Sequence, residues 1–330
     1  MKKNDREFVE SVKHGGTHSF FKRAVELGIK VAPLKDHPKV IRLILGDKRV
    51  YVRTGSIPVF KMMGHLTKNK SITKSILSEV GIEVPRGMVV EKAKNFKKTM
   101  IVKNKLRYPL IVKPQNSSRA RGVTWDVKNA DEAAKAVKFS EHESKSPIII
   151  EEMFVGEEFR VLVYKGKFIA AVHKIPPTIY GDGKNDIAQL IKTYNKSRAK
   201  EKYLKIDDDL KKGLKLSGLS LDSVPEKDQK LKLKNTFLMS EGARLVNANK
   251  YFDRNLREIC QKSATILNLQ LGGVDIIINN ETKKPSYVIL EVNSNPFYNM
   301  HEKELIEGNS FDVSRLILND LFPELKKNNK

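Results

Sequence analysis

The chain has 330 residues, 40% of them hydrophobic and 31% charged, a length and balance that suit a soluble globular protein of one or two domains. Its 62 lysines and arginines against 39 acidic residues give a net charge of +23, which admits an anionic substrate, a nucleic acid or simply a lysine-rich proteome. No apolar run approaches the roughly 20 residues that span a bilayer, so we expect no membrane partner.

Two further features of the composition narrow the class. Aromatic residues make up only 7% of the chain and the lysines are spread along its whole length, so we do not expect a base-stacking nucleic-acid surface. The first residues are polar and lack the apolar stretch of a secretory signal, and Cys260 is the only cysteine, so no internal disulfide forms. We therefore expect a cytoplasmic protein with Cys260 in its core.

Hydrophobic periodicity divides the chain into three parts. Residues 1–66 are predicted to form a short N-terminal α/β segment, with a helix over 19–27 and strands over 40–45 and 49–53. The second part, residues 67–155, alternates helices and strands. Its predicted elements are a helix over 70–80 that ends before Gly81, a strand over 110–113, a helix over 131–139 and a strand over 148–151.

The third part, residues 156–330, begins with a predicted hairpin. Its strands cover 159–164 and 167–173 and turn at Lys165 and Gly166. Lysine-rich helices fill the middle, and a long helix is predicted over 253–268. Two apolar, β-branched runs then indicate a pair of buried strands.

Three oxygen-bearing side chains gather on those last strands. Asp275 lies in the first apolar run, and Glu291 and Asn293 lie two residues apart in the second, so a strand directs both to one face. Mg²⁺ prefers hard oxygen donors and is usually held by one or two carboxylates together with nucleotide phosphates. The arrangement indicates an enzyme that handles ATP.

A lysine and a polar loop are candidates for phosphate contacts. Lys113 ends an apolar strand, where its charge could meet phosphate oxygens, although an ordinary lysine at a strand end explains it as well. The small, basic loop that follows, residues 115–122, could cradle phosphate with its backbone N–H groups. This loop matches neither the Walker nor the Rossmann glycine pattern, so its signal alone is weak.

The acidic stretch after the strand over 148–151 has two interpretations. Its glycine hinge, Gly156, could offer backbone groups to an adenine edge while Glu158 accepts hydrogen bonds from a ribose. A hairpin with a solvated acidic turn explains the same residues equally well.

Taken in order, these residues resemble the ATP-grasp superfamily, which includes D-alanine–D-alanine ligase, glutathione synthetases and cyanophycin synthetase. The resemblance implies an α+β ATP-grasp fold whose two α+β subdomains clasp ATP, with residues 67–155 as the small nucleotide lid and 156–330 as the metal and substrate part. It implies that Lys74 and Lys113 bind the phosphates. The remaining implied contacts are Ser117, Arg121, Gly122, Glu151, Glu152, Phe154 and Glu158 for ATP, and Asp275, Glu291 and Asn293 for two Mg²⁺ ions, with Mn²⁺ as an alternative.

Two segments bring the resemblance closer to the ATP-grasp part of bifunctional glutathione synthetases and of cyanophycin synthetase. They are residues 175–191, around Gly181-Asp182-Gly183-Lys184, and residues 295–301. The chain departs from that branch at residues 239–242, where Met-Ser-Glu-Gly stands in place of Ser-Thr-Gly-Gly, so the amino acceptor can differ.

This chain also lacks an arginine that D-alanine–D-alanine ligase carries near its metal site, so the corresponding positive charge must come from another residue. There an arginine lies two residues before the metal aspartate, and this chain has Gly273. Arg160 is the first candidate to replace that charge, and Lys174 and Arg244 are further catalytic candidates. His301 could contact substrate, but a surface or core histidine is the simpler explanation.

The resemblance implies an ATP-dependent carboxylate–amine ligase that forms an amide or peptide bond through an acyl phosphate and releases ADP and Pi. Its substrates would be amino acids or short peptides, one of them acidic, and relatives in the branch suggest a homodimer. One alternative remains a basic ATP-binding regulatory or nucleic-acid-associated protein on a degenerate scaffold, although the intact metal set argues against degeneration. Another is an enzyme of the same fold that makes a phosphorylated product.

Overall fold

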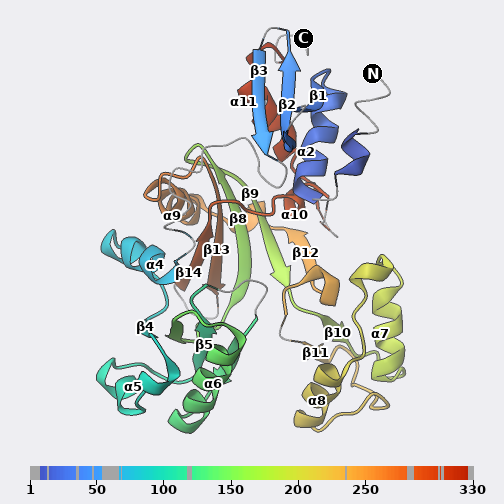
Figure 1. Cartoon of the computed structure of the whole chain (residues 1–330). Coiled ribbons are helices and arrows are strands. Elements are labelled where there is room, and N and C mark those ends of the chain that lie inside the picture. The colour runs from blue at the N-terminus through green and yellow to red at the C-terminus, as the bar shows by residue number, and fades with distance from the viewer. Residues whose placement is uncertain are drawn as a thin grey trace.

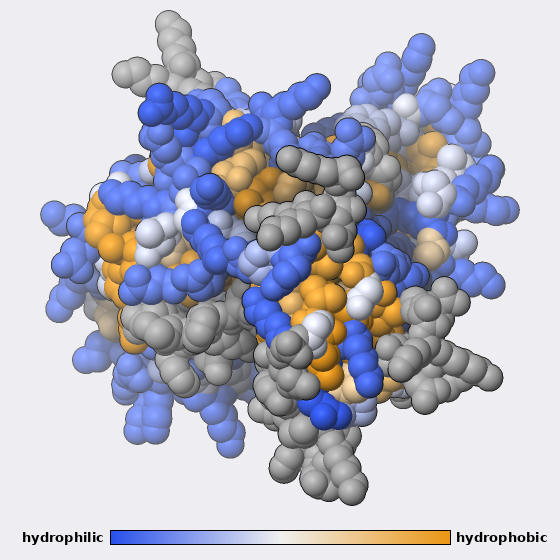
Figure 2. All heavy atoms as spheres, turned by 90° about the horizontal axis from the view of Figure 1, so that it is seen from above, coloured by the Kyte–Doolittle hydropathy of each residue, from blue (hydrophilic) through white to orange (hydrophobic). Residues whose placement is uncertain are grey.

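Figure 1 shows the computed structural model of the chain, in which peripheral lobes surround a central sheet. The structure describes residues 8–12, 15–34, 37–46, 48–53, 67, 69–116, 121–234, 236–280, 286–303, 305 and 308–325. Within these residues no helix has the length and apolar character needed to cross a membrane. Seen from above, hydrophilic side chains surround smaller apolar patches on the visible face (Figure 2).

The lobe at the top of Figure 1 joins the two ends of the chain. Its elements are α2 (Gly15–Glu26), the antiparallel strands β1 (Lys30–Leu34), β2 (His37–Leu45) and β3 (Lys48–Arg53), and α11 (Val313–Leu321). One core contains Phe20 and Ile41 from the N-terminal elements together with Ile317 and Phe322. The N-terminal segment therefore shares its hydrophobic core with the last helix. α2 begins before the predicted helix because Thr17 is buried as well.

The four-stranded sheet of the second part has one apolar face and one face that carries charged side chains. Its elements are β4 (Gly87–Val90), β5 (Leu110–Pro114), β6 (Thr124–Val127) and β7 (Ile148–Glu152), in the order β4-β7-β5-β6, with α4 (Lys70–Glu79), α5 (Thr99–Lys103) and α6 (Ala130–Glu143). Val112 and Ile150 pack against α6, so strand alternation turns Lys113 and Glu151 to the other face. α6 is longer than predicted because Ser140 continues its buried stripe.

The five-stranded antiparallel sheet lies at the centre of the molecule (Figure 1). It contains β8 (Glu157–Tyr164), β9 (Lys167–Ile175), β12 (Arg244–Asn247), β13 (Leu271–Asn279) and β14 (Ser286–Asn293), in the order β12-β9-β8-β13-β14. α9 (Arg254–Thr265) covers one face, and Cys260 is buried there as expected. α9 ends before the predicted residue 268 because Asn268 has a positive φ of 50°.

The opposite face of this sheet is divided between two neighbours. Leu162 and Tyr164 of β8 belong to the core of the N-terminal lobe. Glu158 and Arg160, which point to the same face of β8, lie beyond that core and are left to a polar cluster. The N-terminal lobe thus covers the part of this face near Tyr164 and leaves the part near Glu158 to polar side chains.

A fourth, smaller core lies at the lower right of Figure 1. Its elements are β10 (Thr178–Tyr180), α7 (Ile187–Asn195), α8 (Asp208–Leu216) and β11 (Lys230–Lys232). The two helices lie in the region where lysine-rich helices were predicted, and the two strands pair in a small sheet. A short helix, α10 (Asn299–Glu302), follows β14 and contacts both α2 and β9.

Candidate active site

Two lysines and one glutamate form a buried group on the small sheet, which we call the lysine cluster (Lys74, Lys113 and Glu151). Lys113 and Glu151 come from the neighbouring strands β5 and β7, and Lys74 comes from α4. Lys113 Nζ lies 2.7 Å from Glu151 Oε2, and Lys74 Nζ pairs with the other carboxylate oxygen. Only 8% of Lys74 and 2% of Glu151 are exposed.

Burial disfavours each charge of the lysine cluster, and pairing decides which charges persist. Burial lowers the pKa of Lys74 to about 8, and the neighbouring charge of Lys113 adds to the fall. Burial raises the pKa of Glu151, but the charges of Lys113 and Lys74 outweigh it and hold this pKa at about 2. Because two lysines share one carboxylate, the cluster has excess positive charge at neutral pH, which favours an anion such as phosphate.

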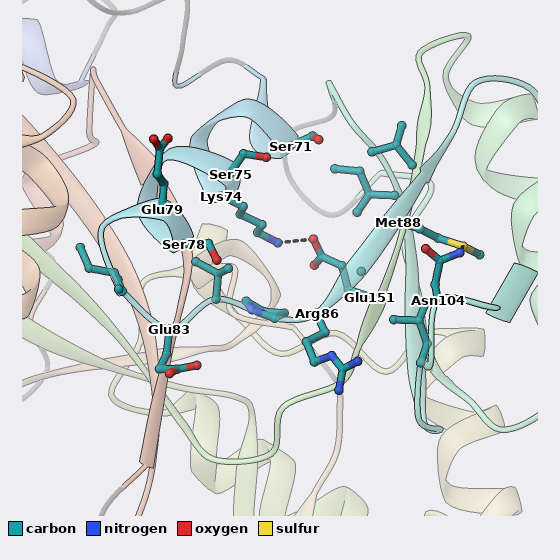
Figure 3. Close-up of a pocket in the computed structure, with 18 residues that line it drawn as sticks. Ser71, Lys74, Ser75, Ser78, Glu79, Glu83, Arg86, Met88, Asn104 and Glu151 are labelled. Atoms are coloured by element: carbon teal, nitrogen blue, oxygen red, sulfur yellow. Dashed lines mark hydrogen bonds and ion pairs between the residues drawn. The ribbon is translucent and has the colours of Figure 1, made fainter. Parts of the chain in front are cut away.

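A cavity of about 590 Å³ opens beside this cluster, between α4 and the edge of the small sheet. Figure 3 shows Lys74 and Glu151 pointing toward each other at its wall, with Ser71 and Ser75 of α4 nearby. The cavity provides a polar space next to Lys74.

The predicted metal ligands form one hydrogen-bonded group on the central sheet. Asp275 and Glu291 are direct cross-strand partners on β13 and β14. Asn293 Nδ2 donates to Asp275 Oδ2 at 3.2 Å and to Glu291 Oε1 at 3.0 Å. The structure thus brings together three side chains that the sequence placed on two separate runs.

Protein cations occupy the carboxylates of this group. Arg160 Nε and Nη2 each donate to one oxygen of Asp275 at 2.6 Å, and Lys174 Nζ lies 3.7 Å from Asp275 Oδ1. Lys174 also pairs with Glu158, and Lys70 Nζ lies 3.5 Å from Glu291 Oε2. We call this group the carboxylate cluster; its members are Lys70, Glu158, Arg160, Lys174, Asp275, Glu291 and Asn293.

The two central carboxylates differ in how easily they ionise. Burial raises the pKa of Asp275 to about 6 against the opposing charges of Arg160 and Lys174, and only 3% of the residue is exposed. Burial also raises the pKa of Glu291, but the charge of Lys70 and the hydrogen bond from Asn293 together bring it below its usual range. Glu291 is therefore ionised at any pH near neutrality.

The donor set of the carboxylate cluster fits a hard divalent cation. Asp275 and Glu291 supply carboxylate oxygens, and a half-turn of the Asn293 amide would present its oxygen in place of its nitrogen. The described residues contain no group of three or more His, Cys, Asp or Glu side chains placed to hold a metal. A cation held only by Asp275, Glu291 and Asn293 would therefore have coordination positions left for water and phosphate oxygens, as Mg²⁺ prefers.

α4 links the lysine cluster to the carboxylate cluster. Lys74 of this helix reaches Glu151, and Lys70, one turn earlier, reaches Glu291. Asn69 caps the helix and also accepts a hydrogen bond from Gln115, at the start of the polar loop. Groups from residues 69 to 293 therefore meet in one region of the molecule.

The other predicted ATP contacts occupy varied positions. Ser117 lies outside the described residues. Arg121 pairs with Glu143 at 3.2 Å, and Gly122 has a φ of +71°. Glu152 bonds Arg107 at 3.1 Å, while Phe154 is half-buried.

The remaining catalytic candidate, Arg244, begins β12. It pairs with Ile175, so strand alternation turns it to the face opposite Lys174. Its positive charge lies near Tyr194 and Arg198 instead of the carboxylate cluster. Its role, like that of every other candidate above, remains a prediction.

Two features of the site were missed from the sequence. The partnership of Lys70 with Glu291 could have been noticed, because Lys70 lies four residues before Lys74 on one face of a predicted helix. The counter-ion position of Glu151 depends on the register of β5 against β7, which no local pattern announces.

Comparison with known proteins identifies relatives of this chain. A family model described as "D-ala D-ala ligase C-terminus" matches residues 76–203. Cyanophycin synthetase of Trichormus variabilis is 30% identical over 268 residues, which cover 78% of this chain and 29% of the relative. The glutathione biosynthesis bifunctional protein of Mannheimia succiniciproducens is 27% identical over 331 residues, covering 92% of this chain and 42% of the relative.

A solved structure agrees with these relatives at the level of fold. The bifunctional glutathione synthetase from Pasteurella multocida matches with a TM-score of 0.67 and 24% identity, covering 94% of this chain and 44% of that one. The predicted α+β ATP-grasp fold is confirmed, and the family model and the curated relatives support the ATP-grasp superfamily for this chain. The chain spans less than half the length of the curated relatives it matches.

Proposed function

We propose that the chain is an ATP-dependent carboxylate–amine ligase that forms an amide or peptide bond and releases ADP and Pi. One observation carries the proposal: the lysine cluster, with excess positive charge, and the carboxylate cluster, with oxygen donors for a cation, are joined through α4. A nucleoside triphosphate with its metal ion needs cationic side chains for the phosphates and oxygen donors for the metal within one site. The glutathione and cyanophycin synthetases among the relatives support the ligase class.

The proposed reaction has two steps. An oxygen of the substrate carboxylate attacks the γ-phosphorus of ATP, which forms an acyl phosphate and releases ADP. The amine of the second substrate then attacks the acyl carbon, loses a proton and expels Pi. The protein contributes mainly position and charge, as in other phosphoryl transfers.

Named residues would divide this work. Lys74 and Lys113 bind phosphate oxygens, while the hinge residues Glu152 and Phe154 and the ribose partner Glu158 hold the nucleoside. The loop residues Ser117, Arg121 and Gly122 cover the phosphates. Arg160, Lys174 and Arg244 stabilise negative charge on the transferred group and on the carboxylate substrate.

Asp275, Glu291 and Asn293 would hold the divalent cation. When bound, Mg²⁺ neutralises charge on the phosphate oxygens during transfer. We propose two Mg²⁺ ions, with Mn²⁺ able to replace them.

We propose amino acids or short peptides as substrates, one of them acidic, in a cytoplasmic homodimer. The net charge of +23 supports an acidic substrate by long-range attraction. Residues 1–66, 67–155 and 156–330 are proposed as the N-terminal segment, the nucleotide lid and the metal and substrate part.

A screen of ADP release across a matrix of amino acids and dipeptides tests the proposal. We expect ADP only with one acid and amine pair, and mass spectrometry should find the corresponding amide. Nucleotide binding without ADP release for any pair would contradict a ligase and favour the regulatory alternative. A phosphorylated product without an amide would contradict the second step.

A further inference from the structure

His301 of α10 is buried, and its ring has no hydrogen-bond partner among the described residues. Only 1% of the residue is exposed, and neither Nδ1 nor Nε2 meets a partner in the part of the chain that the structure describes. Oδ1 of Asn299, at the start of the same short helix, is likewise buried and partnerless there. Buried polar atoms normally find partners, so these three atoms call for an explanation.

The segment around His301 is fastened on both sides. Tyr298 Oη donates to the backbone oxygen of Gly16 at 2.7 Å, which ties the residues before His301 to α2. The Glu302 carboxylate accepts hydrogen bonds from the backbone and the hydroxyl of Ser314 on α11. Because both neighbours are anchored to the N-terminal lobe, the ring cannot easily turn out to water.

His301 is a neutral acceptor within reach of the charge of Arg160. Burial, together with a smaller effect of the positive charge of Arg160, lowers its pKa to about 3. A neutral imidazole has one ring nitrogen free to accept a hydrogen bond. Of the two simpler explanations that the sequence offered, a surface or a core histidine, the structure shows a core position, but the setting is not that of an ordinary core side chain.

Arg160 must give up Asp275 if a divalent cation binds there. Both oxygens of Asp275 accept from Arg160, and like charges repel strongly when they share one buried carboxylate. The other carboxylates of the cluster have cations of their own, Lys174 on Glu158 and Lys70 on Glu291. Only 12% of the Arg160 side chain is exposed, so a displaced guanidinium needs another acceptor inside the protein.

Gly273 lets the side chain of Arg160 and the segment before α10 approach each other closely. A Cβ at Gly273 would lie 3.3 Å from Arg160 Nη1 and 2.6 Å from Cβ of Pro296. Pro296 opens the segment that leads to His301. Because Gly273 has no side chain, the guanidinium and the start of this segment both pack against the same backbone position, and so lie close together.

We propose that His301 is a positioning residue that accepts a hydrogen bond from Arg160 when a divalent cation takes Asp275. This inference rests on the proposed ligase function, in which the free part of the Arg160 fork then faces the transferred phosphate. His301 touches neither ATP nor substrate and acts only through Arg160. The structure, in which Arg160 pairs with Asp275 and the described residues offer the His301 ring no partner, corresponds to the state before the cation binds.

Two variants of His301 test the exchange with a readout of stability. His301→Leu removes both nitrogens at similar volume, and His301→Gln keeps an acceptor oxygen. Asn319→Leu on α11 is the matched control, because it also removes a buried, partnerless oxygen of the described residues. For each protein the melting temperature is measured twice, without cation and with Mg²⁺ and ATP. The rate of ADP release is measured separately as a function of Mg²⁺ concentration.

We expect His301→Leu to melt no lower than the original protein without cation, since it removes unsatisfied polar atoms. Its Mg²⁺ requirement for ADP release should rise about tenfold to a hundredfold, the effect of one hydrogen bond to a charged group. His301→Gln should lose less, and Asn319→Leu should keep the original Mg²⁺ requirement. An unchanged Mg²⁺ requirement in His301→Leu would overturn the inference.

Nitrogen NMR of the unmutated protein keeps the test independent of variant folding. When Mg²⁺ and a non-hydrolysable ATP analogue are added, we expect the ring nitrogens of His301 and Nε of Arg160 to shift together. Shifts at Arg160 with none at His301 would overturn this inference but leave the proposed function standing. An unmutated protein that responds to Mg²⁺ and ATP in neither assay would overturn the proposed function as well.

Discussion

The lysine cluster and the carboxylate cluster are both groups of ion pairs with limited exposure to solvent, but their charges balance differently. Two lysines share Glu151 in the first, so positive charge is left over. In the second, three cations face three carboxylates. The lysine cluster is therefore ready for an anion, whereas the carboxylate cluster must release a cation before it can accept another.

This difference separates a preformed half of the site from a half that changes on binding. Two like unit charges about 4 Å apart repel by about 4 kcal/mol near a protein surface. A divalent cation at Asp275 would meet Arg160 at such a distance, so the two cannot share this carboxylate. We infer that phosphate binding comes with little rearrangement, while cation binding requires Arg160 to move.

Replacing Glu291 should have the largest effect on the carboxylate half. Glu291→Gln keeps the shape of the side chain but removes the charge that attracts a divalent cation. We expect ADP release to fall by about 10³-fold or more, comparable to losing a main electrostatic contact of a transition state. Melting temperature should change little, and Glu258→Gln, at an exposed pair on α9, serves as the control. ADP release at the original rate in Glu291→Gln would remove Glu291 from the metal site.

Replacing Glu151 should have the largest effect on the stability of the lysine half. Glu151→Ala leaves Lys74 and Lys113 buried without their counter-ion, which we expect to cost about 3–5 kcal/mol of unfolding free energy. Chemical denaturation measures this loss. Arg107→Ala breaks the neighbouring, exposed pair with Glu152 and should cost at most about 1 kcal/mol. Equal losses in the two variants would contradict the buried character of the lysine cluster.

A pH series tests whether the charge of Lys74 holds the nucleotide. The pKa of Lys74 in the free protein is lowered to about 8, so this lysine loses its proton as pH rises through 8. ATP affinity should then fall by about tenfold for each further pH unit, because phosphate binds the charged form. Lys74→Arg stays charged and should give a nearly flat profile over the same range. Parallel profiles for both proteins would exclude Lys74 as the titrating group.

Gly122 offers the smallest effect and tests the loop beside the lysine cluster. Gly122 and Gly218 have nearly the same positive φ, +71° and +72°, but only at Gly122 would a Cβ meet neighbours, Glu143 and Pro114 at 2.9 Å. We expect Gly122→Ala to cost about 1–2 kcal/mol more unfolding free energy than Gly218→Ala. A matching cost in the two variants would show that the loop can give way freely.

The parts of the site that follow from local pattern were predictable from the sequence. Strand alternation was enough to put Glu291 and Asn293 on one face, and an apolar run before Lys113 was enough to place it at the end of a strand. Elements with strong periodicity, such as α4 and the β8–β9 hairpin, were confirmed close to their predicted bounds.

The parts that depend on long-range register were not predictable. Arg160 and Asp275 lie 115 residues apart and meet only because β8 and β13 pair in one register. The shared core of α2 and α11 likewise joins opposite ends of the chain, and no local pattern of either helix names its partner. Pairing of residues distant in sequence decides which charges neutralise which, and therefore decides how the site works.

Titration calorimetry with ATP, first without and then with Mg²⁺, tests most directly whether the two clusters form one nucleotide site. We expect ATP to bind weakly without a cation, through Lys74 and Lys113, and much more tightly when Mg²⁺ is present. Glu291→Gln should retain the weak binding and lose most of the gain from Mg²⁺. Absence of any binding of ATP in the presence of Mg²⁺ would contradict the assignment of both clusters.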